Sequence, residues 1–327
     1  MSRSRISTIL RTTLALLVVA AVAVAVARNW AAVSADIDKV EGGTFLLAAA
    51  LACIPPVLTM LGWRVLLAEL GSPLHVAPAG GVFFVGQLGK YLPGAVWSIV
   101  AQAEMGARLH IPRRRSAVVA FLAVAIAAIC GLVVGLPAVP LLLTGGDAST
   151  TGWLALLAVP VLGLTFYPPL LNWGVATVLR VLRREPLEQR LSGRAVAKAS
   201  GLFVLTWLSS GLHALVLLKA IGATHPDSPV LLVATLSGFA LASSLAMFSV
   251  VLPAGVGVRE GLLVLMLAPI SSTSAATAVV VLSRFLTVLA DVLFALLGWA
   301  YARRHHLITT REERERDHVV VDDATAG

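Results

Sequence analysis

Long runs of apolar residues, separated by short polar connections, follow one another along this chain of 327 residues. A helix needs roughly 20 apolar residues to cross the hydrocarbon core of a bilayer. The pattern therefore predicts a succession of membrane helices. The apolar runs extend over Thr12 to Ala27, Thr44 to Leu61, Val76 to Ala103, Ser116 to Leu143, Trp153 to Leu179, Leu202 to Ala220, Val230 to Ile270 and Ala275 to Tyr301.

The composition supports an integral membrane protein and excludes an ordinary soluble domain. Hydrophobic residues make up 58% of the chain and charged residues 13%, whereas soluble chains carry about a quarter charged residues. Cys53 and Cys130 both lie inside apolar runs, so we expect core packing and neither a disulfide framework nor a metal site. The excess of 25 Lys and Arg over 17 Asp and Glu indicates membrane topology and no nucleic-acid partner.

The charges of the connections predict which loops face the cytoplasm, because Lys and Arg concentrate on that side. The connections around Asp147 and Asp227 contain no Lys or Arg, and the one from Arg28 to Glu41 is net acidic. We expect these three outside. The expected cytoplasmic segments are the N-terminus, Arg108 to Arg115, Arg180 to Lys198, Arg303 with Arg304, and a loop from Gly62 to His75.

The first apolar run, with Arg3, Arg5 and Arg11 before it, also resembles a signal peptide. Because many spans follow, we expect a retained first helix. Both termini are then cytoplasmic.

Two apolar runs must begin and end on the same side if these loop assignments hold. Val76 to Ala103 would start and finish inside, and Leu92-Pro93-Gly94 lies at its centre. Val230 to Ile270 would start and finish outside, with its break at Leu252 to Gly257. Val230 to Val250 is long enough to cross alone, but Gly261 to Ile270 would then have to cross with about 15 Å of helix. We therefore favour two re-entrant hairpins.

The resulting fold class is an all-α polytopic membrane protein built from two inverted repeats, each of three transmembrane helices plus a re-entrant helical hairpin. Repeat A covers residues 1–145 with a hairpin at about 76–104, and repeat B covers 150–302 with a hairpin at about 230–270. Residues 303–327 form a disordered, charged cytoplasmic tail. Inverted repeats with broken helices are typical of transporters; the alternative is that Pro and Gly only kink ordinary spans.

Polar residues beside the two breaks are the candidate substrate-binding residues: Gln87, Lys90, Tyr91, Arg259 and Glu260. An ionisable group at this depth costs roughly 2.5 to 3.5 kcal/mol on insertion and needs a partner or a substrate. The helix N-termini expected near Ala95 and Val258 suit a phosphate. The competing interpretation is a purely structural ion pair between Lys90 and Glu104 or Glu260.

Further polar residues within the apolar runs are expected to form structural contacts between helices. Arg284 and Asp291 are seven residues apart on one helix face, so we expect each to bind a neighbour on another helix. With Glu104 they form a set of supporting intramembrane charges. His213 is expected to be a packed polar residue, and Gly131 to Gly135 a tight packing site. No nucleotide-binding, zinc-protease or nucleophile motif is present, so we expect no cofactor, no metal and no enzymatic activity.

The segments GQLGKYLPGAVW (86–97) and LPAGVGVREG (252–261) resemble the flippase-like transmembrane family, to which the transmembrane domain of lysylphosphatidylglycerol synthase/flippase (multiple peptide resistance factor) belongs. By motif position the resemblance assigns the hairpin turns to Gly89, Pro93, Gly94, Pro253, Gly255 and Gly257, and includes Glu260. Ala254 departs from the family, which more often has glycine there. The chain also stops soon after its last apolar run, so we expect the flippase part without the soluble aminoacyl-transferring domain.

The resemblance implies a protein of the bacterial plasma membrane that moves a lipid between leaflets. Our leading hypothesis is a translocase of an anionic or phosphate-linked lipid, with a phospholipid or a polyprenyl-phosphate lipid as the partner. One alternative is a non-transporting subunit that presents such a lipid to a separate lipid-modifying enzyme, a glycosyltransferase or synthase. The other is a secondary transporter of a small anion. The sequence leaves the oligomeric state open.

Overall fold

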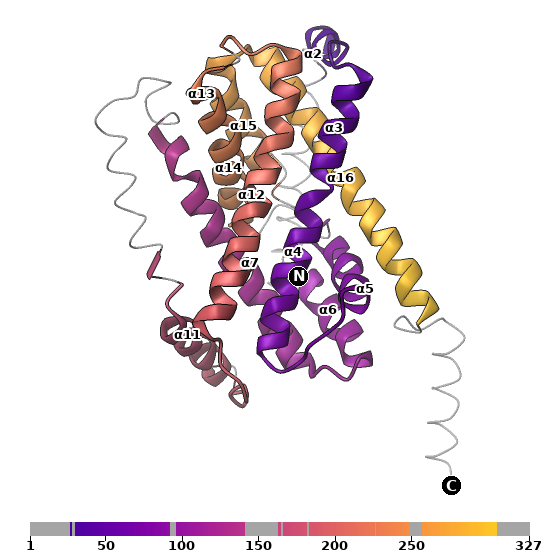
Figure 1. Ribbon diagram of the computed structural model, residues 1–327, viewed down its shortest axis with the longest axis vertical. Coiled ribbons are helices and arrows are strands. Elements are labelled where there is room, and N and C mark those ends of the chain that lie inside the picture. The colour runs from indigo at the N-terminus through magenta and orange to yellow at the C-terminus, as the bar shows by residue number, and fades with distance from the viewer. Residues whose placement is uncertain are drawn as a thin grey trace, which may run out of the picture.

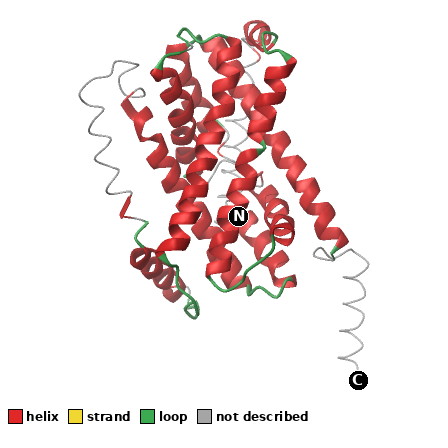
Figure 2. Ribbon diagram, in the orientation of Figure 1, coloured by secondary structure: helices red, strands yellow, loops and turns green. Residues whose placement is uncertain are grey.

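The computed structural model describes residues 27, 30–91, 96–140, 163–164, 166–181, 183–225, 227–248, 255 and 257–305, and every regular element in these ranges is a helix (Figures 1 and 2). Several predicted features lie outside the described residues. These are nearly all of the first apolar run, the turn residues Pro93, Gly94 and Pro253, the connection at Asp147 and the tail from residue 306.

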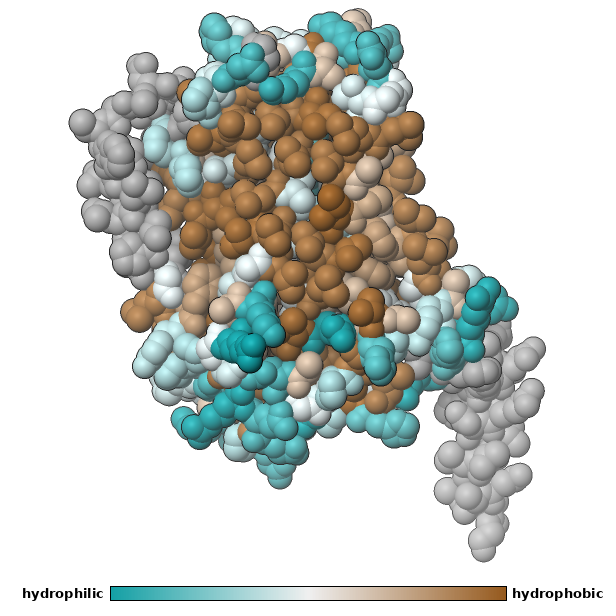
Figure 3. Space-filling view, in the orientation of Figure 1, coloured by the Kyte–Doolittle hydropathy of each residue, from teal (hydrophilic) through white to brown (hydrophobic). Residues whose placement is uncertain are grey.

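Five helices within the described ranges are long and apolar enough to cross a membrane: Gly42–Glu69, Arg113–Ala138, Gly193–Ile221, Pro229–Met247 and Thr273–Arg304. A broad hydrophobic band covers the middle of the molecule, and hydrophilic residues gather at its two ends (Figure 3). The predicted all-α membrane fold is confirmed. The relation of the two halves as inverted repeats stays a prediction.

The first described span consists of α3 (Gly42–Ala52) and α4 (Ile54–Glu69), which join at Cys53 just before Pro55 and Pro56. Prolines at the start of α4 donate no backbone hydrogen bond, which interrupts the helical ladder. The loop expected from Gly62 to His75 is wrong in its first half, because the helix continues to Glu69. Arg64, the cation that suggested a loop, donates from Nε to the Leu74 carbonyl at 2.6 Å.

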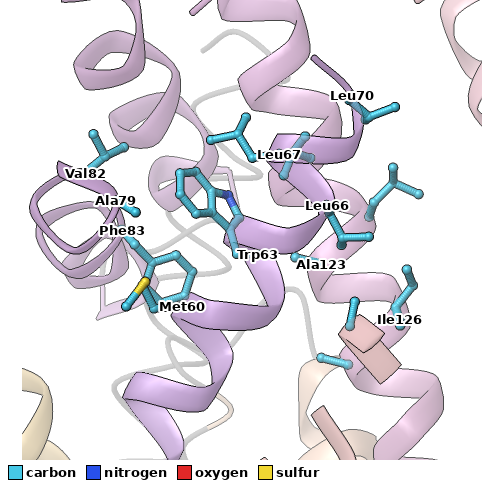
Figure 4. Close-up of a cluster of buried hydrophobic side chains, with 14 of the residues drawn as sticks. Met60, Trp63, Leu66, Leu67, Leu70, Ala79, Val82, Phe83, Ala123 and Ile126 are labelled. Carbon is cyan, nitrogen blue, oxygen red and sulfur yellow. The ribbon is translucent and has the colours of Figure 1, made fainter. Parts of the chain in front are cut away.

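The helix α12 (Gly193–Ile221) lies at the centre of the bundle and packs against α4, α3 and α7 (Arg113–Gly135). A Cβ on Gly62 would lie 2.7 Å from the Phe203 ring, so this glycine allows α4 to approach α12 closely. On the other side of α4, Trp63 is fully buried and its ring centroid lies 5.6 Å from that of Phe83 (Figure 4). Large apolar side chains thus fill the space around α4.

The first hairpin, residues 76–108, contains α5 (Val76–Gln87), the 3-10 helix η1 (Leu88–Tyr91) and α6 (Trp97–Arg108). Its α-helices have 12 residues each and span about 18 Å, short of the ~30 Å hydrocarbon core. They pack against each other. Arg115, just beyond the hairpin, donates to the Gly71 carbonyl at 2.9 Å and to Ser72 Oγ at 2.7 Å. The chain therefore returns to the end of the molecule from which it started.

The second hairpin, residues 229–270, contains α13 (Pro229–Leu232), the π-helix η3 (Val233–Ser237), α14 (Gly238–Met247), α15 (Val258–Leu267) and the 3-10 helix η5 (Ala268–Ile270). The Thr224 amide donates to the Ile270 carbonyl at 3.0 Å. This bond joins the segment just before the hairpin to its last residue. The α13–η3–α14 arm is 19 residues long and could span by length, but α15 returns beside α14 to the same end.

The predicted span Trp153 to Leu179 is wrong in its C-terminal part. The described chain turns at Phe166 and Tyr167, and a separate helix, α11 (Pro168–Val181), begins at the Pro168–Pro169 pair. Asn172 fixes α11 to the following loop, since its side chain donates to the Leu191 carbonyl at 3.0 Å and accepts from the Leu191 amide at 2.9 Å.

The long last helix, α16 (Thr273–Arg304), extends along both hairpins and packs against α5, α12 and α15. At its start it also contacts α2 (Trp30–Ile37). Burial raises the pKa of the Asp36 carboxyl there, but hydrogen bonds from Lys39 and Ser274 and the Lys39 charge together hold this pKa below its ordinary value. Asp36 therefore joins α2 to α16 as a carboxylate.

Small residues allow α7 to approach α14, as the Gly131 to Gly135 motif predicts. A Cβ on Gly135 would lie 2.8 Å from the Leu241 Cα, and one on Gly131 would collide with the Ser244 side chain.

Candidate functional site

A cavity of about 400 Å³ is bordered by both hairpins and by helices α4, α7, α12 and α16. Most of its wall is apolar, with alanine, valine, proline and phenylalanine side chains. The charged residues and amides that line it are Gln87, Lys90, Gln102, Arg259, Arg284 and Asp291, and the Tyr91 phenol joins them. Of the predicted binding residues, the structure thus brings Gln87, Lys90, Tyr91 and Arg259 to one cavity.

Asp291 of α16 accepts two hydrogen bonds from η1. The Lys90 ammonium lies 2.7 Å from Asp291 Oδ2, and the Tyr91 hydroxyl donates to the same oxygen at 2.5 Å. The Asp291 side chain is only 14% exposed, whereas the Lys90 side chain is 37% exposed. The lysine therefore keeps contact with the cavity while its partner is buried.

Arg284 of α16 lies beside Glu260 of α15, with 3.6 Å between the guanidinium Nη1 and Glu260 Oε1. The other Glu260 oxygen accepts a hydrogen bond from the Gly257 amide at 2.7 Å. Glu260 therefore caps the N-terminus of α15 with its own carboxylate. The expectation of a free anion site at this helix end needs correction, because the negative charge is already supplied from within the helix.

Arg259, next to Glu260 in sequence, has entirely different neighbours. Its guanidinium lies 4.6 Å from the centroid of the Phe239 ring and donates to Ser283 Oγ at 3.4 Å. Ser283 also shares a 2.8 Å hydrogen bond with Nε2 of His213, a fully buried residue whose ring meets Phe239 edge to face. Among the described residues, no carboxylate lies within 4.0 Å of the Arg259 guanidinium.

Positive charges outnumber negative charges on the described wall of the cavity. Lys90, Arg259 and Arg284 line the cavity together with one carboxylate, that of Asp291. Glu260 neutralises Arg284 and Asp291 neutralises Lys90. Of the three cations on the described wall, Arg259 is the one without an ion-pair partner, and an anion in the cavity would meet its charge directly.

Glu104 does not join the cluster of intramembrane charges. Its side chain is 58% exposed and binds the guanidinium of Arg113 through both carboxylate oxygens, at 2.8 and 2.9 Å. Glu104 lies in the last turns of α6, near the short 109–112 turn that brings Arg113 within reach. The competing interpretation, an ion pair of Lys90 with Glu104 or Glu260, is wrong in its partner, because Lys90 pairs with Asp291. Arg284 and Asp291 do bind different elements, as expected.

The structure describes three of the predicted turn glycines, Gly89, Gly255 and Gly257, and at each of them a side chain would be unfavourable. A Cβ on Gly89 would collide with the backbone of Trp97 and Ser98, so η1 and α6 touch through their backbones. Gly255 and Gly257 have φ values of +65° and +90°, which side chains rarely permit. The glycines thus allow the two breaks to fold tightly beside the cavity.

Sequence reasoning missed several residues of this site. Gln102 is 4% exposed and lines the cavity, and its buried Oε1 atom has no hydrogen-bond partner among the described residues. An amide inside an apolar run was the available signal. Ser283 and Phe239 could not be identified from the sequence, because their role depends on contacts with Arg259 that only the packing of the helices creates. His213 is a packed polar residue, as expected.

These features define a polytopic helical membrane protein with a cavity between two helical hairpins and helices α4, α7, α12 and α16, where Arg259 has no carboxylate beside it among the described residues. The family model described as the lysylphosphatidylglycerol synthase TM region matches residues 12–295, and the chain belongs to this family. The resemblance of the two motifs is thereby confirmed, and the family relates the protein to membrane lipids. A comparison with curated proteins found no match.

Proposed function

We propose that the protein moves a lipid with an anionic, phosphate-bearing headgroup between the leaflets of the membrane, and that the cavity holds this headgroup during passage. The observation that carries the proposal is the Arg259 guanidinium, which lines the cavity without a carboxylate beside it among the described residues. A cation inside a membrane domain is costly unless it is compensated. A phosphate supplies the missing negative charge.

Arg259 is well suited to a phosphate. A guanidinium binds phosphate oxygens through two parallel hydrogen bonds, and such charge-assisted bonds are about twice as strong as neutral ones. The Phe239 ring packs against the guanidinium and Ser283 accepts a hydrogen bond from it, so its position is fixed. The cost of removing water from the phosphate is then offset by donors whose positions are already fixed.

Lys90 provides a second cation through an exchange of partners. Its ammonium binds Asp291, but its partly exposed side chain lines the same cavity. When a phosphate enters, Lys90 can contact it while Tyr91 continues to donate to Asp291. Gln87 and Gln102 add amide donors on the same wall.

The rest of the wall suits lipid chains. Ala120, Ala123, Val124 and Ala127 of α7 line the cavity with Pro55 and Pro56 of α4. Such a surface is compatible with the acyl chains of a phospholipid and with a polyprenyl chain. We therefore propose the phosphate-linked headgroup as the feature recognised, in a bacterial plasma membrane with both termini in the cytoplasm, by a transporter that carries out no chemical step.

The test measures lipid distribution in proteoliposomes. The purified protein is reconstituted with fluorescent phosphatidylglycerol or with a fluorescent short-chain polyprenyl phosphate, and a membrane-impermeant quencher reports the lipid that reaches the outer leaflet. Arg259→Gln should slow transfer roughly tenfold or more, since it removes a charged hydrogen-bond donor. Lys219→Gln is the matched control, because Lys219 binds Asp227 at the other end of α12, away from the cavity.

Each other outcome has a defined meaning. An unchanged lipid distribution with the wild-type protein would contradict transport and leave presentation of lipid to a separate lipid-modifying enzyme. Uptake of radiolabelled inorganic phosphate without lipid transfer would indicate a small-anion transporter. Equal rates for Arg259→Gln and Lys219→Gln would remove Arg259 from the site.

A further inference from the structure

The helix α11 presents an apolar surface that no other described element covers. Its outward residues include Leu170, Trp173, Val178 and Val181, of which Trp173 is 64% and Val181 is 77% exposed. At 100° per residue these four positions fall within one broad face of the helix. At 14 residues α11 is about 21 Å long, too short to cross a bilayer.

The opposite face of α11 is fixed to the protein. Leu179 is buried, and Leu171 and Val175 pack against the core around Trp63 and Phe203. Asn172 binds the backbone of Leu191 through two hydrogen bonds. The outward face is therefore held in a defined orientation.

Basic residues that have no ion-pair partner among the described residues follow this apolar face along the chain, at the end of α11, in the next loop and at the start of α12. The acidic residues of the adjoining loop, Glu185 and Glu188, bind Arg114 and Arg115 of α7. No ion pair within the described residues engages the remaining basic side chains of this region, which are Arg180, Arg183, Arg184, Arg190, Arg194 and Lys198.

This surface lies at the basic end of the molecule. The loop after α11 reaches the C-terminal end of α4, where the Ser192 amide donates to Glu69 at 3.1 Å. Figure 1 shows α11 beside the lower end of α12. An exposed apolar helix face bordered by basic residues, at the edge of a membrane domain, has the composition of an interfacial helix.

We propose that α11 lies in the headgroup layer of the membrane, with Leu170, Trp173 and Val181 directed toward the acyl chains and the uncompensated arginines bound to anionic phospholipid headgroups. Lys and Arg residues near an anionic membrane surface contribute about 1 kcal/mol each to binding. Burial of the apolar face among the acyl chains also favours binding. A protein partner would have to supply both an apolar patch and several acidic groups. An anionic monolayer supplies both. The site is separate from the cavity and does not depend on transport.

Retention of bound lipid tests the charged part of the proposal. The full-length protein is placed in nanodiscs of phosphatidylcholine and phosphatidylglycerol, and native mass spectrometry measures the phosphatidylglycerol retained after extraction. Arg180→Gln combined with Arg184→Gln should weaken retention by about 25-fold, from about fivefold per arginine. Arg113→Gln with Arg114→Gln is the matched control at the same end of the molecule, and it should change retention little because Glu104 and Glu185 already pair with these arginines. Equal effects of the two pairs would overturn the proposal.

A spin label tests the position of the helix in the same nanodiscs. With Cys53 and Cys130 replaced, a label at Leu170→Cys should be accessible to oxygen dissolved in the lipid and protected from a water-soluble nickel reagent. A label at Pro186→Cys, in the exposed loop, should show the reverse. Access of the nickel reagent to both labels would place α11 in water, and protection of Leu170→Cys from both reagents would indicate a covering protein surface; either result would overturn the proposal.

Discussion

Asp291 accepts hydrogen bonds from two consecutive residues, Lys90 and Tyr91. Tyr91 lies 200 positions before Asp291 in the sequence. A carboxylate buried to this extent must keep at least one strong donor. Tyr91 remains such a donor when Lys90 moves. This redundancy is what allows the lysine to exchange its partner for a substrate phosphate in the proposed mechanism.

Substitution of Lys90 and Asp291 separates a structural from a binding role of the lysine. Lys90→Met alone should lower the stability by about 1 to 3 kcal/mol, because it leaves a buried charge with one donor fewer. The double substitution Lys90→Met with Asp291→Asn removes that charge and should recover most of the thermal stability. Lipid transfer should nevertheless stay low, since the cavity has lost a phosphate ligand.

Thermal unfolding in detergent and the proteoliposome assay together check this prediction. Full transfer by the double variant would show that Lys90 only neutralises Asp291, and Arg259 would then act alone. Failure of the double variant to recover stability would show that the two residues do not form an independent pair.

At this scale the sequence predicts which residues matter better than it predicts their partners. Ionisable groups inside apolar runs identify Lys90, Arg259, Glu260, Arg284 and Asp291 without any structure. Their pairing depends on how α16 packs against η1 and α15, and spacing along the chain contains no information about this. Glu104 was expected among the same charges, but its side chain is exposed and binds Arg113, nine residues later at the start of α7.

Among the elements, the breaks of the two hairpins are constrained by close backbone contacts. Gly255 combines a φ of +65° with a Cβ position 2.7 Å from the Ala246 Cβ atom. A side chain at this position would meet both a forbidden backbone region and a neighbouring helix. The break is therefore specified by backbone geometry as well as by apolar packing.

Replacing Gly255 with valine should lower stability by about 1 to 3 kcal/mol and strongly reduce lipid transfer. Gly163→Val is the control, since a Cβ at Gly163 would have no atom within 4 Å. Thermal unfolding and lipid transfer are measured for both variants. Equal losses would show that the break is not a sensitive position.

Breaker residues explain why the hairpins could be predicted and why α11 could not. The first interrupted run has Gly94 directly after Pro93, and the second has Gly255 and Gly257 after Pro253. The sides expected for the flanking loops require the chain to return at both points. The pair Pro168–Pro169 was an equally good signal for a break within Trp153 to Leu179, but the surrounding apolar residues extended the predicted span across it. Apolar character alone does not separate a crossing helix from one whose apolar face points outward at the end of the molecule.

In the described part of the molecule, most of the basic residues gather at one end. Figure 1 places the start of α7, α11 and the C-terminal end of α16 at that end, and α2 and α13 at the other. Arg113 begins α7 and Arg304 ends α16, whereas Lys39 and Lys219 pair with Asp36 and Asp227. The rule that Lys and Arg face the cytoplasm then predicts the orientation of the protein.

Labelling of single cysteines in intact cells checks this orientation. With the native cysteines replaced, His75→Cys and Arg108→Cys, which bracket the first hairpin, should both resist a membrane-impermeant reagent until the cells are opened. Asp227→Cys, whose native side chain is 95% exposed, should react in intact cells. Opposite behaviour of His75→Cys and Arg108→Cys would mean that the first hairpin crosses the membrane.

The long helix α16 carries both ion-pair partners of the hairpins, Arg284 for Glu260 and Asp291 for Lys90. These two positions are seven residues, about 10 Å, apart on one face of a continuous helix. A rotation or shift of α16 that lengthens one ion pair must therefore displace the other. If the proposed function holds, a headgroup that draws Lys90 away from Asp291 would in this way also shift the conformation of the second hairpin, because both ion pairs depend on the position of α16.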